Sequence, residues 1–115
     1  MSGPVRLYVP TTLEALRDAV VAGGLGVVPD AVVAEGDGEE QEYAALMTAA
    51  DASAALLDGP GRRVVAVAEV ASDDAPVALA DLVALHADAA DRPTGADPDE
   101  DLGWYAVQEL ADLLA

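Results

Sequence analysis

Two acidic runs carry the side chains that could bind a cation. The run EGDGEEQE contains Asp37, Glu39, Glu40 and Glu42, and a second run, DPDED, spans residues 97–101. Hard cations such as Ca²⁺ take several oxygen ligands, but neither run has the D-x-[DN]-x-[DN]-G spacing of a calcium loop. Negative charge near a helix N-terminus is stabilised by the helix dipole. We therefore expect no specific metal, and we interpret both runs as helix starts, with Glu39 and Glu42 kept as candidate binding residues because they share a helical face.

The single histidine is the one candidate for acid–base catalysis. His86 stands in HADAAD, and on a strand His86 and Asp88 would share a face, where the carboxylate could hold the imidazole. A nucleophile to accompany it is hard to find, since Ser53 falls in a predicted helix, Ser72 falls in a predicted turn, and no G-x-S-x-G motif occurs. A surface or strand-end histidine is the favoured interpretation, and His86 remains a weak catalytic candidate.

Aromatic side chains with a few polar neighbours could line a small-molecule pocket. The candidates for such a pocket are Arg6, Tyr8, Tyr43, Trp104, Tyr105 and Gln108. With one Trp, three Tyr and no Phe, these rings are also the only large ones available to fill a core. Core packing is therefore the favoured alternative for them.

The residue types that the chain lacks argue against several chemistries. The sequence has no lysine, so it offers no P-loop lysine and no Schiff base for pyridoxal phosphate. It has no cysteine, which excludes disulfides, a thiolate nucleophile and cysteine-ligated zinc. The segment GGLGVV follows a predicted helix rather than a strand and lacks G-x-G-x-x-G. We expect no cofactor.

The negative net charge of the chain restricts the kinds of molecule that we expect it to bind. Five arginines face 22 acids, for a formal net charge of −17, so direct binding to nucleic acid or to an anionic membrane is not expected. The acids could instead attract a basic protein or imitate a nucleic acid, although solubility alone is the favoured explanation. The start MSGPVRLYVP lacks the pattern of a secretory signal, and no apolar run approaches the ~20 residues that span a bilayer. We expect a cytoplasmic protein.

Hydrophobic periodicity predicts seven elements in one domain, residues 1–115. We expect strands at residues 4–9, 31–34, 62–70 and 83–87, and helices at residues 12–22, 38–57 and 98–115. Thr11 with Glu14 and Asp37 with Glu40 resemble capping boxes for the first two helices. Tyr43, Leu46 and Met47, with Ala50, Ala54 and Leu57, form the predicted apolar stripe of the second helix.

The order β-α-β-α-β-β-α predicts an α+β fold, a single two-layer domain with a roughly four-stranded mixed sheet and about three helices mainly on one face. In the last helix Trp104, Val107 and Leu114 widen the apolar face, so this helix is expected to contact a partner as well as the sheet.

Several stretches together resemble a family of short, uncharacterised actinobacterial proteins. The resemblance is carried by VRLYVPTTLEALR, EGDGEEQEYAALMTAA, RRVVAVAEV, VALHADAAD and GWYAVQELADLL. It covers most of the chain and implies a cytoplasmic bacterial protein without a known activity. The resemblance implies V-D-D at the position where this chain has Ala87-Asp88-Ala89, so we expect that one acid near His86 is missing here.

The leading hypothesis is a protein-binding or self-associating module, with a protein partner or a second copy as the ligand. The alternatives are a small-molecule-binding domain or enzyme centred on His86 and the aromatic residues, and an acidic mimic of nucleic acid. Enzymatic activity is not expected.

Overall fold

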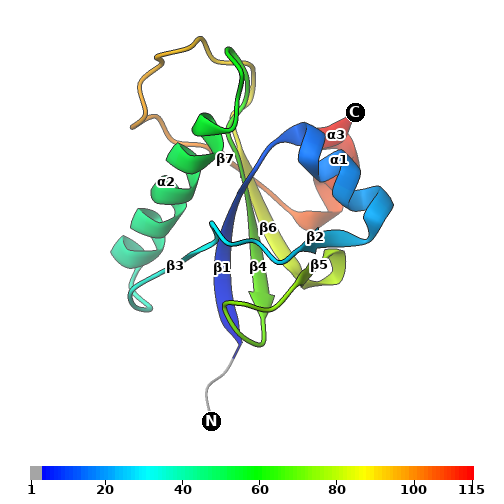
Figure 1. The fold of residues 1–115 in the computed structure, drawn as a ribbon. Helices are drawn as coiled ribbons and strands as arrows, with labels where there is room; N and C mark the ends of the chain where they lie inside the picture. The colour runs from blue at the N-terminus through cyan, green and yellow to red at the C-terminus, as the bar shows by residue number, and fades with distance from the viewer. Residues whose placement is uncertain (1–3) are drawn as a thin grey trace.

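A computed structural model describes residues 4–115 as an antiparallel sheet with helices packed against it (Figure 1). The strands are β1 (Val5–Thr11), β2 (Gly24–Gly26), β3 (Val32–Val33), β4 (Val64–Val70), β5 (Val77–Ala78), β6 (Leu82–Ala87) and β7 (Gly103–Tyr105). The α-helices are α1 (Leu13–Ala22), α2 (Glu39–Ala55) and α3 (Leu110–Leu114), and the 3₁₀ turns are η1 (Leu79–Asp81) and η2 (Val107–Glu109). The predicted α+β class is confirmed.

Five strands form the main sheet in the order β3-β1-β4-β6-β7, and β2 pairs with β5 in a small second sheet. Every strand pair in residues 4–115 is antiparallel, so the sheet is larger than the four strands expected and is not mixed. The predicted strand at residues 62–70 becomes the central β4, which pairs along its whole length with β1 from Val5↔Val70 to Thr11↔Val64.

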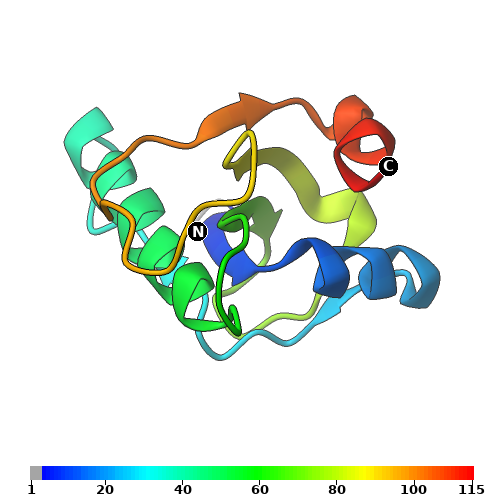
Figure 2. The same ribbon diagram turned by 90° about the horizontal axis from the view of Figure 1, so that it is seen from above.

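Helices cover both faces of the sheet rather than mainly one, so the domain has three layers instead of two (Figure 2). On one face, Leu7 and Val9 of β1 join a core cluster that includes Leu16 of α1 and Leu113 of α3. On the other face, Tyr8 packs with alanines of α2. The strands β1 and β4 are apolar on both faces, as is usual for strands covered on both sides.

The first helix agrees closely with its prediction, and the second differs in the face that it buries. Thr12, one residue after the predicted cap, accepts a hydrogen bond from the Ala15 amide at 3.0 Å, and Gly23 ends α1 with a φ of 93°. In α2 no side chain caps the start. Its buried residues are Ala45, Ala49, Ala50 and Ser53. These small side chains allow the helix to lie close to the sheet, and the larger residues of the predicted stripe turn sideways or outward.

The predicted C-terminal helix is wrong for most of its length, because residues 98–102 are irregular and residues 103–105 form β7. The carbonyl oxygens of Pro98 and Glu100 accept hydrogen bonds from the Arg63 guanidinium at 3.2 and 2.8 Å. In a helix those carbonyls would instead accept hydrogen bonds from backbone amides four residues later. Gly103 also favours the strand over the helix interior. Within residues 4–115, no helix is long and apolar enough to cross a membrane.

Candidate functional site

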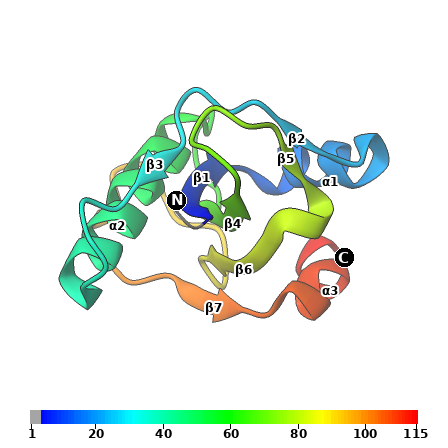
Figure 3. The same ribbon diagram turned by 90° about the horizontal axis from the view of Figure 1, so that it is seen from below.

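A groove lies between strand β3 and helix α2. These two elements lie side by side and run in opposite directions, at one edge of the main sheet (Figures 1 and 3). The groove has a volume of about 420 Å³. Its lining residues are Val32, Val33, Ala34, Glu35, Glu40, Gln41, Ala44, Ala45 and Thr48. We call this hollow the β3–α2 groove.

Small side chains on the helix create the groove. Ala44 and Thr48 are exposed along α2, and Ala45 beneath them is buried against the sheet. From the strand, Val32 and Ala34 pack toward the same cluster. Because the helix residues that line its middle, Ala44, Ala45 and Thr48, are small, the space beside β3 stays open there and is mostly apolar.

The groove is acidic at one end. Glu35 follows β3 and Glu40 lies in the first turn of α2, and both side chains are exposed. No arginine lines the groove. As expected from the sequence, acids start a helix here, since Glu39, Glu40 and Glu42 lie in the first turn of α2. The fold also places Glu35 and Glu40 in the lining of the groove.

A second hollow of about 370 Å³ brings together three of the sequence-predicted binding residues, Arg6, Tyr8 and Glu42. Arg6 donates a hydrogen bond to Glu69 at 2.9 Å and lies 3.6 Å from a Glu42 oxygen. Burial raises the pKa of the Tyr8 hydroxyl, and the nearby Glu42 carboxylate raises it further. This hollow is therefore polar, and Arg6, the one cation among its described lining residues, is already paired.

The other predicted site residues lie elsewhere. The Tyr43 hydroxyl donates to Asp101 at 2.7 Å, and Gln108 is exposed in η2. Trp104, 63% exposed on β7, is the cross-strand neighbour of the half-buried His86 on β6. Glu39 is exposed at the start of α2 and lines neither hollow.

The structure does not bring together the residues of the predicted aromatic pocket or those of the predicted exposed patch. The predicted pocket residues divide between the two sides of the central strand β4, since Arg6 and Tyr8 lie on β1 while His86 and Trp104 lie on β6 and β7. The expected exposed patch also divides, because Val107 packs against the core with Leu114 while Trp104 alone is exposed.

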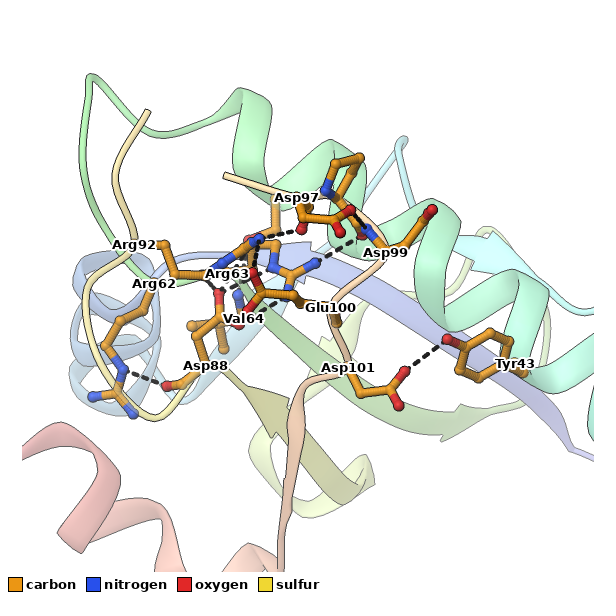
Figure 4. Close-up of polar contacts among 12 residues, drawn as sticks. Tyr43, Arg62, Arg63, Val64, Asp88, Arg92, Asp97, Asp99, Glu100 and Asp101 are labelled. Carbon is orange, nitrogen blue, oxygen red and sulfur yellow. Dashed lines mark hydrogen bonds and ion pairs between the residues drawn. The ribbon is translucent and has the colours of Figure 1, made fainter. Parts of the chain in front are cut away.

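Asp88 is bound by Arg63, although the sequence suggested His86 as its partner. The Asp88 carboxylate accepts three hydrogen bonds from Arg63, at 2.8 Å from its amide and at 3.0 and 2.8 Å from Nε and Nη2 (Figure 4). Arg63 is 1% exposed and Asp88 6%. Burial alone raises the pKa of the Asp88 carboxyl, but the bonds from Arg63 and the charge of Arg92 outweigh it, so this pKa is lowered. Burial lowers the pKa of His86.

The Arg63–Asp88 pair fastens the long segment between β6 and β7. Besides Asp88, Arg63 holds the carbonyls of residues 98 and 100, and the Arg62 Nε donates to the Asp88 carbonyl at 2.6 Å (Figure 4). Sequence reasoning missed this cluster. Its only signal was that two of the five arginines stand together before the most apolar strand.

Metal binding has no support from the geometry of residues 4–115, where no group of three or more His, Cys, Asp or Glu side chains is arranged to hold an ion. The expectation that the protein binds no specific metal stays a prediction.

The fold and the hollows define a small α+β domain with an open sheet edge beside a helix. The chain belongs to the family of unknown function DUF6912, whose sequence model matches residues 5–114. Comparisons with curated proteins and with solved structures find no match. The expected resemblance to an uncharacterised family is confirmed, and the function has to be argued from the site.

Proposed function

We propose that the protein is a protein-binding module whose β3–α2 groove takes an extended segment of another protein. In this binding mode the segment adds to the sheet edge, main-chain hydrogen bonds supply affinity, and alternate side chains enter pockets. The observation that carries the proposal is the pairing of an open edge strand with an adjacent apolar groove.

The sheet edge is available to a partner. Strand β3 pairs with β1 alone among the strands of residues 4–115, so its outer side faces no other strand there. Edge strands present unpaired N–H and C=O groups that readily accept another strand, and proteins commonly cover or shorten them. β3 is short, with two residues, which limits indiscriminate pairing and leaves the groove to select the partner.

The groove supplies what the short strand lacks. Its volume of about 420 Å³ is within the range of roughly 300–1,000 Å³ typical of ligand sites. From Glu40 to Thr48 the helix wall is about 12 Å long, at ~1.5 Å per residue. An extended segment rises ~3.3 Å per residue, so three or four of its residues would lie along this wall.

A nuclear magnetic resonance titration tests the proposal. The probe is a short neutral peptide that alternates threonine and valine, added to ¹⁵N-labelled protein. We expect the amide signals of residues 32–35 and 41–48 to shift together, while those of α1 and α3 stay in place. Shifts confined to β7 and its neighbours, or no shifts at all, would overturn the proposal.

Two matched variants of α2 separate groove filling from a general effect. Ala44→Phe places a ring in the groove and should abolish the shifts. Ala55→Phe puts the same ring on an exposed position at the other end of α2, outside the groove lining, and should leave binding unchanged. Both positions are exposed, so both variants should fold.

A second candidate function, small-molecule binding, is favoured by the hollow that contains Arg6, Tyr8 and Glu42. Its volume suits a small ligand, and its polar groups could orient one. Amide shifts at residues 5–8 with a small molecule, and none with the peptide, would favour this function over the first.

A further inference from the structure

We infer that the segment bound in the β3–α2 groove is basic, with an arginine or lysine at the Glu35–Glu40 end and an apolar residue two positions away. This inference rests on the proposed function, since it names the chemistry of the partner for the same groove. It depends on three features of that groove: its charge, the spacing along its wall, and the sequence of β3 itself.

The charge of the groove favours a cation. Among residues 4–115, Glu35 and Glu40 are the only charged residues that line it. Both are exposed, so their carboxylates can turn toward an incoming basic side chain. Complementary charge of this kind speeds encounter and excludes partners of like charge. In a chain with a net charge of −17, the wider field adds to the same preference.

The spacing of the groove fixes where the two side chains lie. In an extended segment, residues i and i+2 face the same side and are ~6.6 Å apart. Along α2, Glu40 and Ala44 are one turn apart, about 6 Å at ~1.5 Å per residue. A side chain beside Glu40 therefore places the one two residues away beside Ala44, at the apolar middle. The small Ala44, with Thr48 beyond it, leaves room there for a valine or a leucine.

The sequence of β3 argues against a second copy as the occupant. Val32 and Val33 are flanked by Asp30 on one side and by the acidic run 35–42 on the other. Pairing two copies through this edge would bring these acids together, and like charges directly opposite each other destabilise strand pairs. A basic partner has no such cost, so between the two partners that the sequence left open, another protein is favoured over self-association.

Three peptides that differ in one residue test the inference. Each alternates threonine with two groove-facing residues, a valine and either arginine, glutamine or glutamate, and each is made in both sequence directions. We expect the arginine peptide to bind about two- to fivefold more tightly than the glutamine peptide, as for an exposed ion pair, and the glutamate peptide to bind weakest. Equal affinities for all three would refute the charge inference and leave the groove proposal standing, whereas no binding by any peptide would refute both.

Reversing the charge of the groove gives a second test, in which the expected result is a reversed order of peptide affinities rather than a loss of binding that misfolding could also cause. The double variant Glu35→Lys/Glu40→Lys should reverse the order, so that the glutamate peptide binds more tightly than the arginine peptide. The matched control is Glu14→Lys/Asp18→Lys, which changes the net charge equally on exposed positions of α1 and likewise replaces a first-turn acid. If the control reverses the order as well, the preference comes from the overall field rather than from the groove, and the positional inference is overturned.

Discussion

At the scale of residues, the most deeply buried ion pair in residues 4–115 is that of Arg63 and Asp88. Arg63 uses its amide and its guanidinium on one carboxylate. Moving two charges out of water is unfavourable for folding. Removing one partner strongly destabilises the folded state, because it leaves an unpaired charge in the interior. The pair therefore specifies where the segment from Asp88 to Glu100 lies, and we expect this segment to loosen when the pair is lost.

Replacing Asp88 with asparagine should lower the free energy of unfolding by roughly 3–5 kcal/mol, the usual cost of breaking a buried ion pair. The pKa of Asp88 is lowered in the folded state, so its contribution is complete above the unfolded pKa and declines as the pH falls through the folded value. Urea unfolding of wild type and Asp88→Asn at neutral and acidic pH measures both effects. The exposed Asp91→Asn is the control and should change little, and a similar loss in both variants would contradict the assigned role.

His86 should make stability sensitive to mild acid. Burial lowers its pKa below the ordinary value, so the unfolded chain takes up a proton at a higher pH than the folded one. Stability is then full above about pH 6.5, the ordinary pKa of histidine, and declines as the pH falls from there toward the folded pKa. Thermal melts of wild type and His86→Gln from pH 7.5 to 5 test this, with a smaller decline expected for the variant. Parallel curves would show that other groups cause the dependence.

At the scale of elements, helix α2 is positioned by a serine as well as by alanines. The fully buried Ser53 donates to the Thr11 carbonyl at 2.7 Å and accepts from the Val64 amide at 2.8 Å. One hydroxyl thus joins the end of β1, the start of β4 and the last turns of α2. This link, with the alanines of the same face, determines the separation between helix and sheet on which the groove depends.

Ser53→Ala should cost about 1–3 kcal/mol, because a buried amide and a buried carbonyl both lose their partner. Ser72, which is outside the core and bonds to Asp74 at 2.6 Å, offers the control Ser72→Ala with an expected change below ~0.5 kcal/mol. Chemical unfolding measures both, and peptide titration of Ser53→Ala would show whether the groove depends on this link. If the two substitutions changed the free energy of unfolding equally, Ser53 would not be the link that positions α2 against β1 and β4.

At the scale of the whole molecule, the acidic surface destabilises the folded state. With 22 acids against five arginines, compact packing brings like charges closer together than the unfolded chain does. Salt at 0.1 M largely screens the repulsion between exposed charges that are more than ~10 Å apart. The basic segment proposed for the β3–α2 groove would relieve part of this repulsion, so binding of that segment should stabilise the folded state.

Raising sodium chloride from about 10 to 150 mM should therefore increase the melting temperature, because the Debye length shortens from ~30 to ~8 Å. Relief of about 1 kcal/mol would raise the midpoint by ~4 °C in a domain of this size. Calorimetry at constant pH measures the shift, and sucrose at matched osmolarity provides a comparison without screening. A midpoint that falls with salt would show that attractive pairs such as Arg6–Glu69 dominate.

The sequence by itself determined the features that depend on local pattern and composition. Hydrophobic periodicity predicted β1, the central β4 and α1, because this signal acts within a few residues. The acids from Glu39 to Glu42 were correctly assigned to a helix start for the same reason.

Only the tertiary structure decided which residues meet. The acidic run at residues 97–101 was interpreted as a helix start. Arg63, remote in sequence, instead binds the carbonyls of residues 98 and 100, and the segment becomes a loop leading into β7. The face that α2 buries was likewise decided by close packing of alanines against the sheet, which periodicity alone does not reveal. The groove exists because β3 lies at an edge of the sheet. The order of the strands is set by many contacts between segments that are distant in sequence. Each of these contacts is weak alone, so a local sequence pattern does not reveal the order.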